Sequence, residues 1–466
     1  MTHVSFRKTL FIFRRDLRLE DNIGLNYALE NSKKVIPCFI FNPEQIDHNP
    51  YRSDACLQFM IESLEDLENK LREKGGKLYL FYGNPIEVID TCIKKLDVEA
   101  VMVNRDYTPF SKDRDQKIES LCRNHQIPFF TFDDALLHAP EDTLKKDGTP
   151  FKIFTPFYRQ ALKCEVQRPT TSSHNRYFSE LVDFSLSPTI YQTILPKRSS
   201  KLPVKGGRDA GKLILQSIKN FSKYDFERDF PAFHKTSLLS AYLKFTVFSP
   251  REVYTYILGH FSKDHALIRS LYWRDFFTSI AFFFPHVFKG AFHAKYDQLE
   301  WNNDHEAFQK WQMGKTGFPV IDAGMRQLNQ TGFMHNRVRM IVASFLTKDL
   351  HLNWQWGEKY FAQKLIDYDP AVNNGNWQWA ASTGCDAQPY FRIFNPWNQQ
   401  KKFDPECGYI KEWIPELRHL TPPVIHNWHN AETAADYPSP MVDHALEAKK
   451  ALALYKRILL SKKSSP

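Results

Sequence analysis

Short apolar runs alternate with amphipathic stretches through the first third of the chain. Five runs have the composition of β-strands: residues Thr9–Phe13, Val35–Phe41, Lys77–Tyr82, Ala100–Asn104 and Ile127–Phe132. Between them, apolar side chains recur at helical spacing over residues 56–71 and again over residues 86–96. Strands that alternate with helices in this way predict βαβ units and a doubly wound parallel sheet.

The pattern changes after residue 137. Residues 138–212 are rich in Pro, Ser, Thr, Lys and Gly, which predicts a long interdomain connection. From residue 213 to residue 466, helical periodicity dominates and strand-like alternation is scarce. We therefore expect an α/β domain over residues 1–137, a linker over 138–212 and an all-α domain over 213–466.

Length and composition agree with this division. A chain of 466 residues exceeds one ordinary domain, and 42% hydrophobic with 25% charged residues is typical of globular proteins. All ten tryptophans lie at or after Trp273, so we expect the two halves of the chain to have different functions. The longest apolar stretch, Phe276–Phe284, is much shorter than the roughly 18 residues that span a bilayer. We expect no signal peptide and no membrane attachment.

Charge and cysteine usage narrow the partners and the compartment. A formal net charge of +9 favours an anionic partner, nucleic acid first, although many enzymes are equally basic. The seven cysteines are scattered and form no close pair. This pattern is typical of a reducing cytoplasm and predicts neither a disulfide framework nor a metal site. We expect a cytoplasmic monomer.

The chemistry of the chain is concentrated in the helical half. The sequence has no HExxH, GxSxG, GxGxxG or P-loop motif, so common hydrolytic mechanisms lose support. Residues 367–384 instead form a dense polar and aromatic block, which is costly in a helical domain unless it binds something. Within it, Trp377 and Trp379 would point roughly 200° apart on a helix. We expect them to serve opposite faces, with core packing as the alternative for both.

Five motifs resemble those of the photolyase/cryptochrome family, and they stand in the same order along the chain. They are FIFRRDLR at 11–18, TSLLS at 236–240, WRD at 273–275, MHNRVRM at 334–340 and NNGNWQWAASTG at 373–384. The resemblance covers essentially the whole chain and is closest to the photolyases that repair cyclobutane pyrimidine dimers. It implies the same layout that the periodicity predicts, with FAD in the helical domain and light-driven repair of DNA as the activity.

By this resemblance, one set of residues would hold FAD: Tyr224, Thr236, Ser237, Leu238, Leu239, Ser240, Arg339, Asp367, Tyr368, Asp369 and Asn373. Thr236 and Ser237 are expected to open a helix, where hydroxyls and backbone N–H groups suit a diphosphate; a plain N-cap is the alternative. Arg339 would pair with Asp367 beside the flavin. Asn373 would face flavin N5, where a neutral amide favours the reduced anion.

The resemblance also implies an electron relay and a substrate side. Trp377, Trp354 and Trp301 would carry electrons between the flavin and the surface, because indole is oxidised more easily than most side chains. Trp273 and Trp379 would stack an extruded dimer. The remaining DNA-side residues would be Arg228, Ser270, Arg274, Asn336, Arg337, Met340 and Gln399.

Two departures from the family pattern leave questions open. Ser270 stands where dimer-repairing relatives carry Glu, so affinity for the lesion or the repair rate is in doubt. Lys289 fits a folate-type antenna, but Phe110 and Ser111 replace the expected Asn-Glu pair. A folate, a deazaflavin, a second flavin or no antenna chromophore therefore remain open.

Two other functions are compatible with the same cofactor. A blue-light photoreceptor would use the flavin and the tryptophan relay for signalling without repair. Repair of (6-4) photoproducts would need a second active-site histidine, but that position is Met340 and only His335 is present. We rank dimer repair first and (6-4) repair last.

Overall fold

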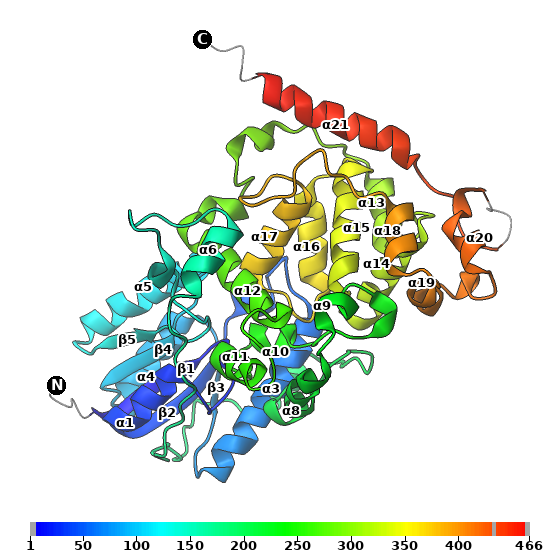
Figure 1. The fold of residues 1–466 in the computed structure, drawn as a ribbon. Helices are drawn as coiled ribbons and strands as arrows, with labels where there is room; N and C mark the ends of the chain where they lie inside the picture. Colours follow the sequence, from blue (N-terminus) through cyan, green and yellow to red (C-terminus); the bar gives the residue numbers. More distant parts are fainter. Residues whose placement is uncertain (1–5, 431–434, 462–466) are drawn as a thin grey trace.

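The computed structural model describes residues 6–430 and 435–461. Its N-terminal part contains one parallel sheet of five strands in the order β3-β2-β1-β4-β5 (Figure 1). The strands are β1 (Phe6–Phe13), β2 (Ser32–Phe41), β3 (Tyr79–Tyr82), β4 (Ala100–Asn104) and β5 (Phe129–Phe132). All five predicted strands are present, and the predicted parallel, doubly wound sheet is confirmed.

Alternating side chains of the central strand separate the two faces of the sheet. Phe11 and Phe13 of β1 point into the core shared with α1 (Ile23–Asn31) and α3 (Asp54–Glu73). Leu10 and Ile12 point into the opposite core, shared with α4 (Pro85–Leu96) and α5 (Pro109–Asn124). This period-2 alternation covers both faces of the sheet with helices. The strand order places the carboxyl ends of β1 and β4 side by side, at the point where that order reverses.

The predicted linker is anchored along the α/β part rather than loosely extended. Tyr177 and Phe178 are buried, and Tyr177 forms a parallel bridge with Val35 of β2. Helices α6 (Phe154–Ala161) and α7 (Ile190–Ile194) interrupt the segment, and α8 (Arg208–Ser217) begins before its predicted end. Isolated aromatic residues fix it to the protein although its composition resembles that of a loop. The limits at residues 137 and 212 stay a prediction.

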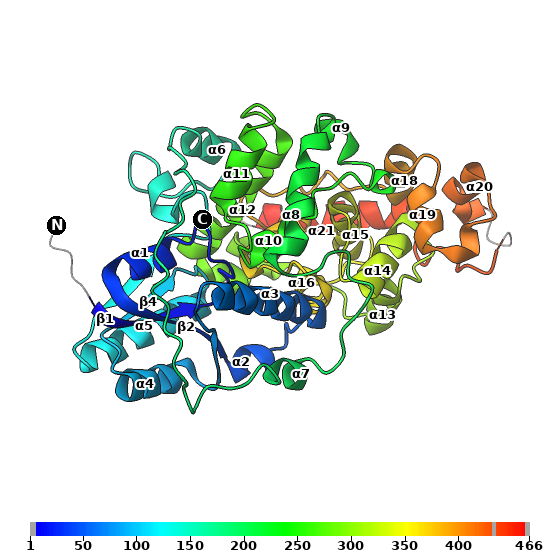
Figure 2. The ribbon, with the colours of Figure 1, turned by 90° about the horizontal axis from the view of Figure 1, so that it is seen from below.

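The rest of the described chain is helical, as predicted. The helices are α8 (Arg208–Ser217), α9 (Tyr224–Glu227), α10 (Ser240–Lys244), α11 (Pro250–Leu258), α12 (Ala266–Phe283), α13 (His305–Met313), α14 (Pro319–Thr331), α15 (Asn336–Lys348), α16 (Trp354–Lys364), α17 (Pro370–Ala380), α18 (Pro396–Phe403), α19 (Gly408–Trp413), α20 (Pro422–His426) and α21 (His444–Ser461); a short α2 (Pro43–Ile46) lies in the first part. Figure 2 shows α3 reaching from the sheet toward this half, where it contacts α8 and α16. None of the helices in the described ranges is long and apolar enough to cross a membrane.

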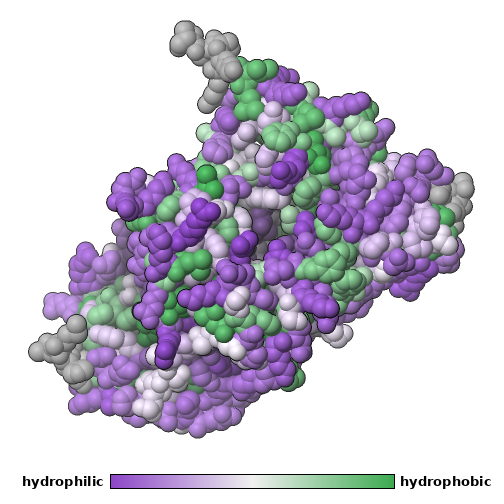
Figure 3. Space-filling model, in the orientation of Figure 1, coloured by the Kyte–Doolittle hydropathy of each residue, from purple (hydrophilic) through white to green (hydrophobic). Residues whose placement is uncertain are grey.

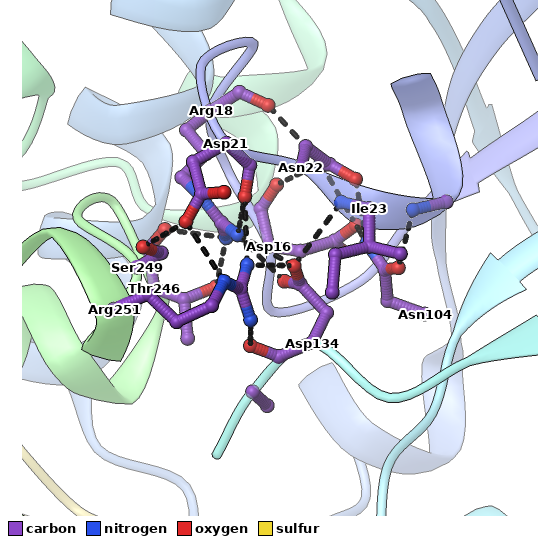
Figure 4. A network of polar contacts seen from close by, with 12 residues as sticks. Asp16, Arg18, Asp21, Asn22, Ile23, Asn104, Asp134, Thr246, Ser249 and Arg251 are labelled. Carbon is purple, nitrogen blue, oxygen red and sulfur yellow. Dashed lines mark hydrogen bonds and ion pairs between the residues drawn. The ribbon is translucent and has the colours of Figure 1, made fainter. Parts of the chain in front are cut away.

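A buried ion network joins the two halves (Figure 4). Arg18, which follows β1, binds Asp134 at 2.7 Å, and Arg251 of α11 binds Asp134 at 2.8 Å and Asp21 at 3.0 Å. Burial alone would raise the pKa of Asp134, but Arg18 and Arg251 hold it below its ordinary value. Buried pairs cost desolvation, so their main effect is to fix one relative placement of the partners.

Candidate functional site

Helix α17 lies at the centre of the candidate site. Its N-cap is Asp369, whose side chain accepts hydrogen bonds from the backbone N–H groups of Ala371 and Val372, and Pro370 occupies the first turn. This chemistry explains why a segment rich in Asn and Gly is helical at all. Asn373 is buried in the next turn, where its amide nitrogen donates to the Glu358 carbonyl at 3.0 Å.

Part of the polar block that sequence analysis singled out supports the backbone. The amide of Asn374 donates to the Val287 carbonyl at 3.0 Å. Gln378, one turn later, donates to the carbonyls of Val287 and Gly290. These two side chains therefore hold the loop after α12 against α17.

The predicted pairing of Arg339 with Asp367 is present. A guanidinium nitrogen of Arg339 lies 2.9 Å from the Asp367 carboxylate, and its Nε donates to the Met334 carbonyl at 2.8 Å. Asp367 is nearly inaccessible, whereas Arg339 keeps partial exposure. The pair links α15 to the segment before α17, so it joins the motif at 334–340 to the polar block at 367–384. Tyr368, the next residue, is half-buried and stacks at 6.4 Å on Tyr51.

A cluster of cations surrounds Asp369, and sequence reasoning missed most of it. Arg15 binds Asp369 at 2.6 Å and Asp106 at 3.3 Å. Burial raises the pKa of Asp369, but Arg15, Lys244 and Arg274 outweigh it and bring the pKa to about 2. Burial, together with the charge of Arg15, holds the pKa of Lys244 and of Arg274 below the ordinary range. The available signal was the position of Arg15 and Asp106 directly after two strands that meet at the switch point.

Arg274 does not extend toward solvent. Its guanidinium donates to the carbonyls of Ala135 at 2.6 Å and Leu243 at 3.1 Å, and its side chain is nearly buried. The sequence analysis expected a DNA contact here. In the structure the cation belongs to the inner cluster around Asp369, where two backbone carbonyls hold it, and this placement favours the cofactor side over DNA.

The TSLLS segment departs from the expected local structure. Helix α10 begins at Ser240, and its N-cap is Leu239, so Thr236 and Ser237 do not open the helix. The reason is a left-handed residue, Leu238 with φ 52°, which turns the chain before the helix can begin. Ser237 accepts a long hydrogen bond from the Leu239 N–H at 3.4 Å. The two hydroxyls therefore lie on a half-buried segment before the helix.

Tyr224, the first residue of α9, packs among aromatic side chains. It is buried, and its ring stacks on Phe221 at 5.4 Å and on His265 at 5.8 Å. Burial raises the pKa of its hydroxyl. The aromatic packing fixes the start of α9 beside α12.

Three tryptophans lie at positions of decreasing burial, from the core toward the surface. Trp377 on α17 is 2% exposed and packs edge-on against Phe361. Trp354 begins α16 and is also buried, whereas Trp301 is half-buried. The Asn302 N–H donates to the His351 carbonyl at 2.8 Å, which ties the Trp301 segment to the loop before Trp354. Burial thus decreases in the order in which the relay was predicted.

Trp379 and Trp273 represent the predicted substrate side. Trp379 is half-buried, in contrast to the buried Trp377 two positions earlier, and both adjoin the same hydrophobic cluster. Trp273 on α12 stacks face to face on Phe154 of α6, with ring centroids 3.6 Å apart and planes within 6°. Sequence reasoning did not identify Phe154, because a residue in the presumed linker offered no signal. The stack fixes the orientation of the Trp273 indole.

Other predicted DNA-side residues lie on neighbouring helix ends. Asn336 and Met340 contact each other on the first turns of α15, with the amide nitrogen 3.9 Å from the sulfur. Arg337 binds Asp229 at 2.8 Å. Ser270 is exposed on α12, and its hydroxyl donates to the Ala266 carbonyl at 2.9 Å.

Two further predicted DNA-side residues are half-buried: Arg228 and Gln399. The Arg228 guanidinium lies over the Tyr224 ring, and Gln399 lies on α18. On the face drawn in Figure 3, a hollow opens near the centre, over α12, α16 and α17.

His335 is a buried histidine at the N-terminus of α15. It caps α15 and is 4% exposed; its Nδ1 accepts from the Arg337 N–H, and its Nε2 meets no partner in the described part of the chain. Burial lowers its pKa to about 4. The imidazole is therefore neutral at neutral pH.

Comparison with known proteins covers both halves of the chain. Residues 9–173 match the family described as DNA photolyase, and residues 267–457 match the FAD binding domain of DNA photolyase. The deoxyribodipyrimidine photo-lyase of Alkalihalophilus pseudofirmus is 38% identical over 95% of this chain and 97% of its own length. The corresponding protein of Vibrio cholerae is 38% identical over 95% and 98%.

Solved structures agree with this similarity. An archaeal photolyase from Sulfolobus tokodaii with two FAD molecules is 43% identical, with a TM-score of 0.89 over 97% of this chain and 100% of its own. A class III photolyase from Agrobacterium tumefaciens is 33% identical, with a TM-score of 0.90 over 97% and 98%. A cryptochrome from Synechocystis is 28% identical, with a TM-score of 0.86 over 97% and 100%.

Proposed function

The chain belongs to the DNA photolyase family, and from this premise we propose that it is a deoxyribodipyrimidine photo-lyase, an enzyme that splits cyclobutane pyrimidine dimers in DNA under light. The observation that carries the proposal is similarity along the whole chain to proteins of that name. The family also includes cryptochromes, so the photoreceptor function is the alternative.

The residues around α17 fit FAD. Arg15, Lys244 and Arg274 crowd around Asp369, and the pKa of both Lys244 and Arg274 is lowered, so the cluster can accept an anionic diphosphate. The hydroxyls of Thr236 and Ser237 lie on a half-buried segment that can donate to phosphate or ribitol oxygens. The remaining residues that would hold the cofactor are Tyr224, Leu238, Leu239, Ser240, Arg339, Asp367, Tyr368 and Asn373. When bound, reduced FAD supplies the light-excited electron that opens the cyclobutane ring.

The protein groups around the flavin would keep protons away from the reaction. Asn373 is held by the Glu358 carbonyl, and its amide can form hydrogen bonds but cannot donate a full proton. The carboxylate of Asp367 is engaged by Arg339. The proposed step needs no general acid or base.

Two indole faces would bind the lesion. Phe154 covers one face of the Trp273 indole at 3.6 Å and Phe277 lies 5.4 Å from it, so a pyrimidine would use the part of the indole that these rings leave accessible. Trp379 is half-buried, whereas Trp377 is buried, so Trp379 is the more accessible of the two indoles of α17. Stacking on aromatic faces is worth about 1–3 kcal/mol per base, and extrusion costs least where the base pair is already damaged. We assign Asn336, Met340 and Ser270 to the polar edge of the lesion.

The tryptophans Trp377, Trp354 and Trp301 would restore the reduced cofactor between cycles. Their burial falls from the interior to the surface, so the terminal indole can exchange electrons with solvent species. Repair itself returns the electron, and the relay is needed only to reduce oxidised cofactor.

A second chromophore has a candidate position at the switch point of the sheet. Arg14, after β1, and Arg114, on α5, gather around the carboxylate of Asp115. Burial and the charge of Arg14 lower the pKa of Arg114 to about 10, which reflects this crowding of cations. We propose that the anionic group of an antenna chromophore binds here. The relative from Sulfolobus tokodaii holds two FAD molecules.

The position expected for a folate is less favourable. The Ser111 hydroxyl already donates to Asp106 at 3.0 Å. Phe110 is exposed, and its apolar ring replaces the polar side chain that a folate would need. Lys289, the residue that fits the folate pattern, is exposed. We therefore favour a flavin or deazaflavin over folate. The absorption and fluorescence spectrum of the purified protein separates these chromophores.

The oligomeric state and the compartment are also proposals. We propose a cytoplasmic monomer, which the seven free cysteines support because a reducing compartment keeps thiols unpaired. Sedimentation velocity gives the oligomeric state.

A three-substrate assay tests the proposed function. Reduced protein is illuminated with oligonucleotides that carry a cyclobutane dimer, a (6-4) photoproduct or no lesion, and the products are separated by chromatography. We expect conversion of the cyclobutane dimer alone, since His335 is neutral and Met340 replaces the second histidine. Conversion of the (6-4) lesion alone, or of neither lesion with FAD fully bound and reduced, would contradict the proposal.

A further inference from the structure

A row of three aromatic rings, two of them exposed and the middle one half-buried, lies on α9 and on the segment that follows it. Phe226 is 64% exposed and Phe233 is 48% exposed, although large apolar side chains on a protein surface usually stand singly. The ring centroids of Phe226 and Phe230 are 4.8 Å apart, and those of Phe230 and Phe233 are 4.9 Å apart. The ring of Phe403 on α18 packs edge-on against Phe230, with the two ring centroids 6.2 Å apart. Phe226, Phe230 and Phe233 are referred to below as the aromatic ridge.

The aromatic ridge is joined to both helices of the substrate side. Helix α9 contacts α12, which carries Ser270 and Trp273. Asp229, between two of the ridge rings, binds Arg337 on the first turn of α15, and the Arg337 guanidinium also lies 4.4 Å from the centre of the Phe403 ring. Figure 3 shows hydrophobic surface in the region of α9, beside the central hollow. The ridge therefore borders the place where a lesion would enter.

Charge around the aromatic ridge favours a polyanionic occupant. Residues 219–235 contain four basic and three acidic side chains, and Arg337 neutralises one of the acids. Arg228 lies within the ridge segment itself. Aromatic rings interleaved with cations are the combination that binds unpaired nucleic-acid strands, with the rings stacking on bases and the cations following phosphates.

We propose that the aromatic ridge stacks on unpaired nucleobases next to the lesion, beside Arg228, which the family resemblance already places on the DNA side. The inference rests on the proposed function, because it assumes that damaged DNA enters the central hollow. A base beside an extruded dimer has lost a stacking partner, and the rings would replace it. Every base has a π face, so the contact adds affinity without adding sequence preference.

Binding of a labelled lesion tests the aromatic ridge. The probes are single-stranded and duplex oligonucleotides with one thymine dimer and a 2-aminopurine beside it. In the double variant Phe226→Ala/Phe233→Ala, we expect affinity to fall about 10-fold or more, the loss of roughly one stacked base. Quenching of 2-aminopurine on binding should be lost as well. The salt dependence of binding should stay that of the wild type, because no phosphate contact is removed.

Two further variants separate stacking from charge and from folding. Arg228→Ala should reduce the salt slope by about one while 2-aminopurine quenching persists. Phe226→Trp should keep both affinity and quenching, since an indole stacks at least as well as a phenyl ring. Leu181→Ala is the matched control, because Leu181 is 85% exposed on the linker, and it should bind like the wild type.

The outcomes that overturn the inference are distinct from failure of the proposed function. Unchanged affinity in the double variant, or in Phe226→Ala alone if the double variant does not fold, overturns the ridge. So does a wild type that sediments as a dimer and a double variant that sediments as a monomer with full DNA affinity, which would assign the ridge to self-association. A wild type that binds the dimer yet does not repair it in light contradicts the proposed function and leaves the binding test of the ridge intact.

Discussion

At the residue scale, the two tryptophans of α17 are expected to have separate roles. Trp377 is buried against Phe361 and Trp379 is half-buried, two positions apart on one helix. Trp377→Phe should abolish photoreduction of oxidised FAD but leave repair by chemically reduced protein, since the phenyl ring preserves packing but is hard to oxidise. Trp379→Ala should weaken dimer binding and spare photoreduction. Equal losses in both assays for both variants would contradict this division.

His335 gives the chain a pH-dependent stability. Burial lowers its pKa from 6.5 to about 4 in the folded protein, so the unfolded chain binds a proton first as the pH falls. Stability is complete above pH 6.5 and is lost progressively as the pH falls toward 4, by roughly 3 kcal/mol in total. His335→Asn keeps a capping side chain and should flatten urea midpoints between pH 7 and pH 5. The exposed His48→Asn should retain the wild-type slope, and the same slope in His335→Asn would refute the assignment.

Ser270 marks a place where the repair reaction can be improved. The residue is exposed and its hydroxyl is bonded to the Ala266 carbonyl, so a carboxylate at this position would not be buried in the free protein. Ser270→Glu should tighten dimer binding by roughly 10-fold, the value of one charge-assisted hydrogen bond. Binding and single-turnover repair are the measurements. Ser120→Glu, at an exposed serine of α5 with the same carbonyl bond four residues back, controls for the added charge; equal behaviour of both variants would count against the idea.

At the element scale, a glycine sets how closely α16 approaches α17. A Cβ at Gly357 would lie 2.1 Å from the Trp377 ring, so only glycine fits at this contact. Gly357→Ala should displace the indole, slow photoreduction and destabilise the fold by about 1–3 kcal/mol. Photoreduction rates and thermal midpoints measure the two effects.

Gly259 provides the matched position for this test. It ends α11, and a Cβ there would meet nothing closer than 3.4 Å. Gly259→Ala should leave both photoreduction and thermal stability near those of the wild type. If Gly357→Ala behaved the same way, the close approach of the two helices would not govern the relay.

Elements were more predictable than contacts between them. Strand composition and helical spacing are local signals, so five strands and the helices over residues 54–73 and 85–96 follow from the sequence. The start of α10 did not, because left-handed Leu238 interrupts a segment whose residues favour a helix cap. The bond between Arg15 and Asp369 joins residues 354 positions apart, and no local pattern could pair them. The same holds for Phe154 on Trp273.

At the scale of the whole molecule, the sheet and the helical half act as one support for the site. The network of Arg18, Asp21, Asp134 and Arg251 fixes their relative placement (Figure 4). Arg15 extends this connection to Asp369, the N-cap of α17. The site is therefore shared, with cations from the end of β1 and polar and aromatic groups from α12, α15 and α17. The sequence motifs predicted most of the residues of this site. The fold shows why Arg15, from the first domain, lies at a candidate cofactor site in the second.

Turnover in light is the measurement that tests the central claim most directly. Protein with fully reduced FAD is mixed with an excess of an oligonucleotide carrying one thymine dimer, and thymine absorbance is followed in light and in darkness. Dimer repair predicts several dimers restored per bound FAD in light and none in darkness. A photoreceptor that shares the flavin and the relay predicts no restored absorbance in either sample, and that result, with reduced FAD still bound, would contradict the assignment as a photolyase.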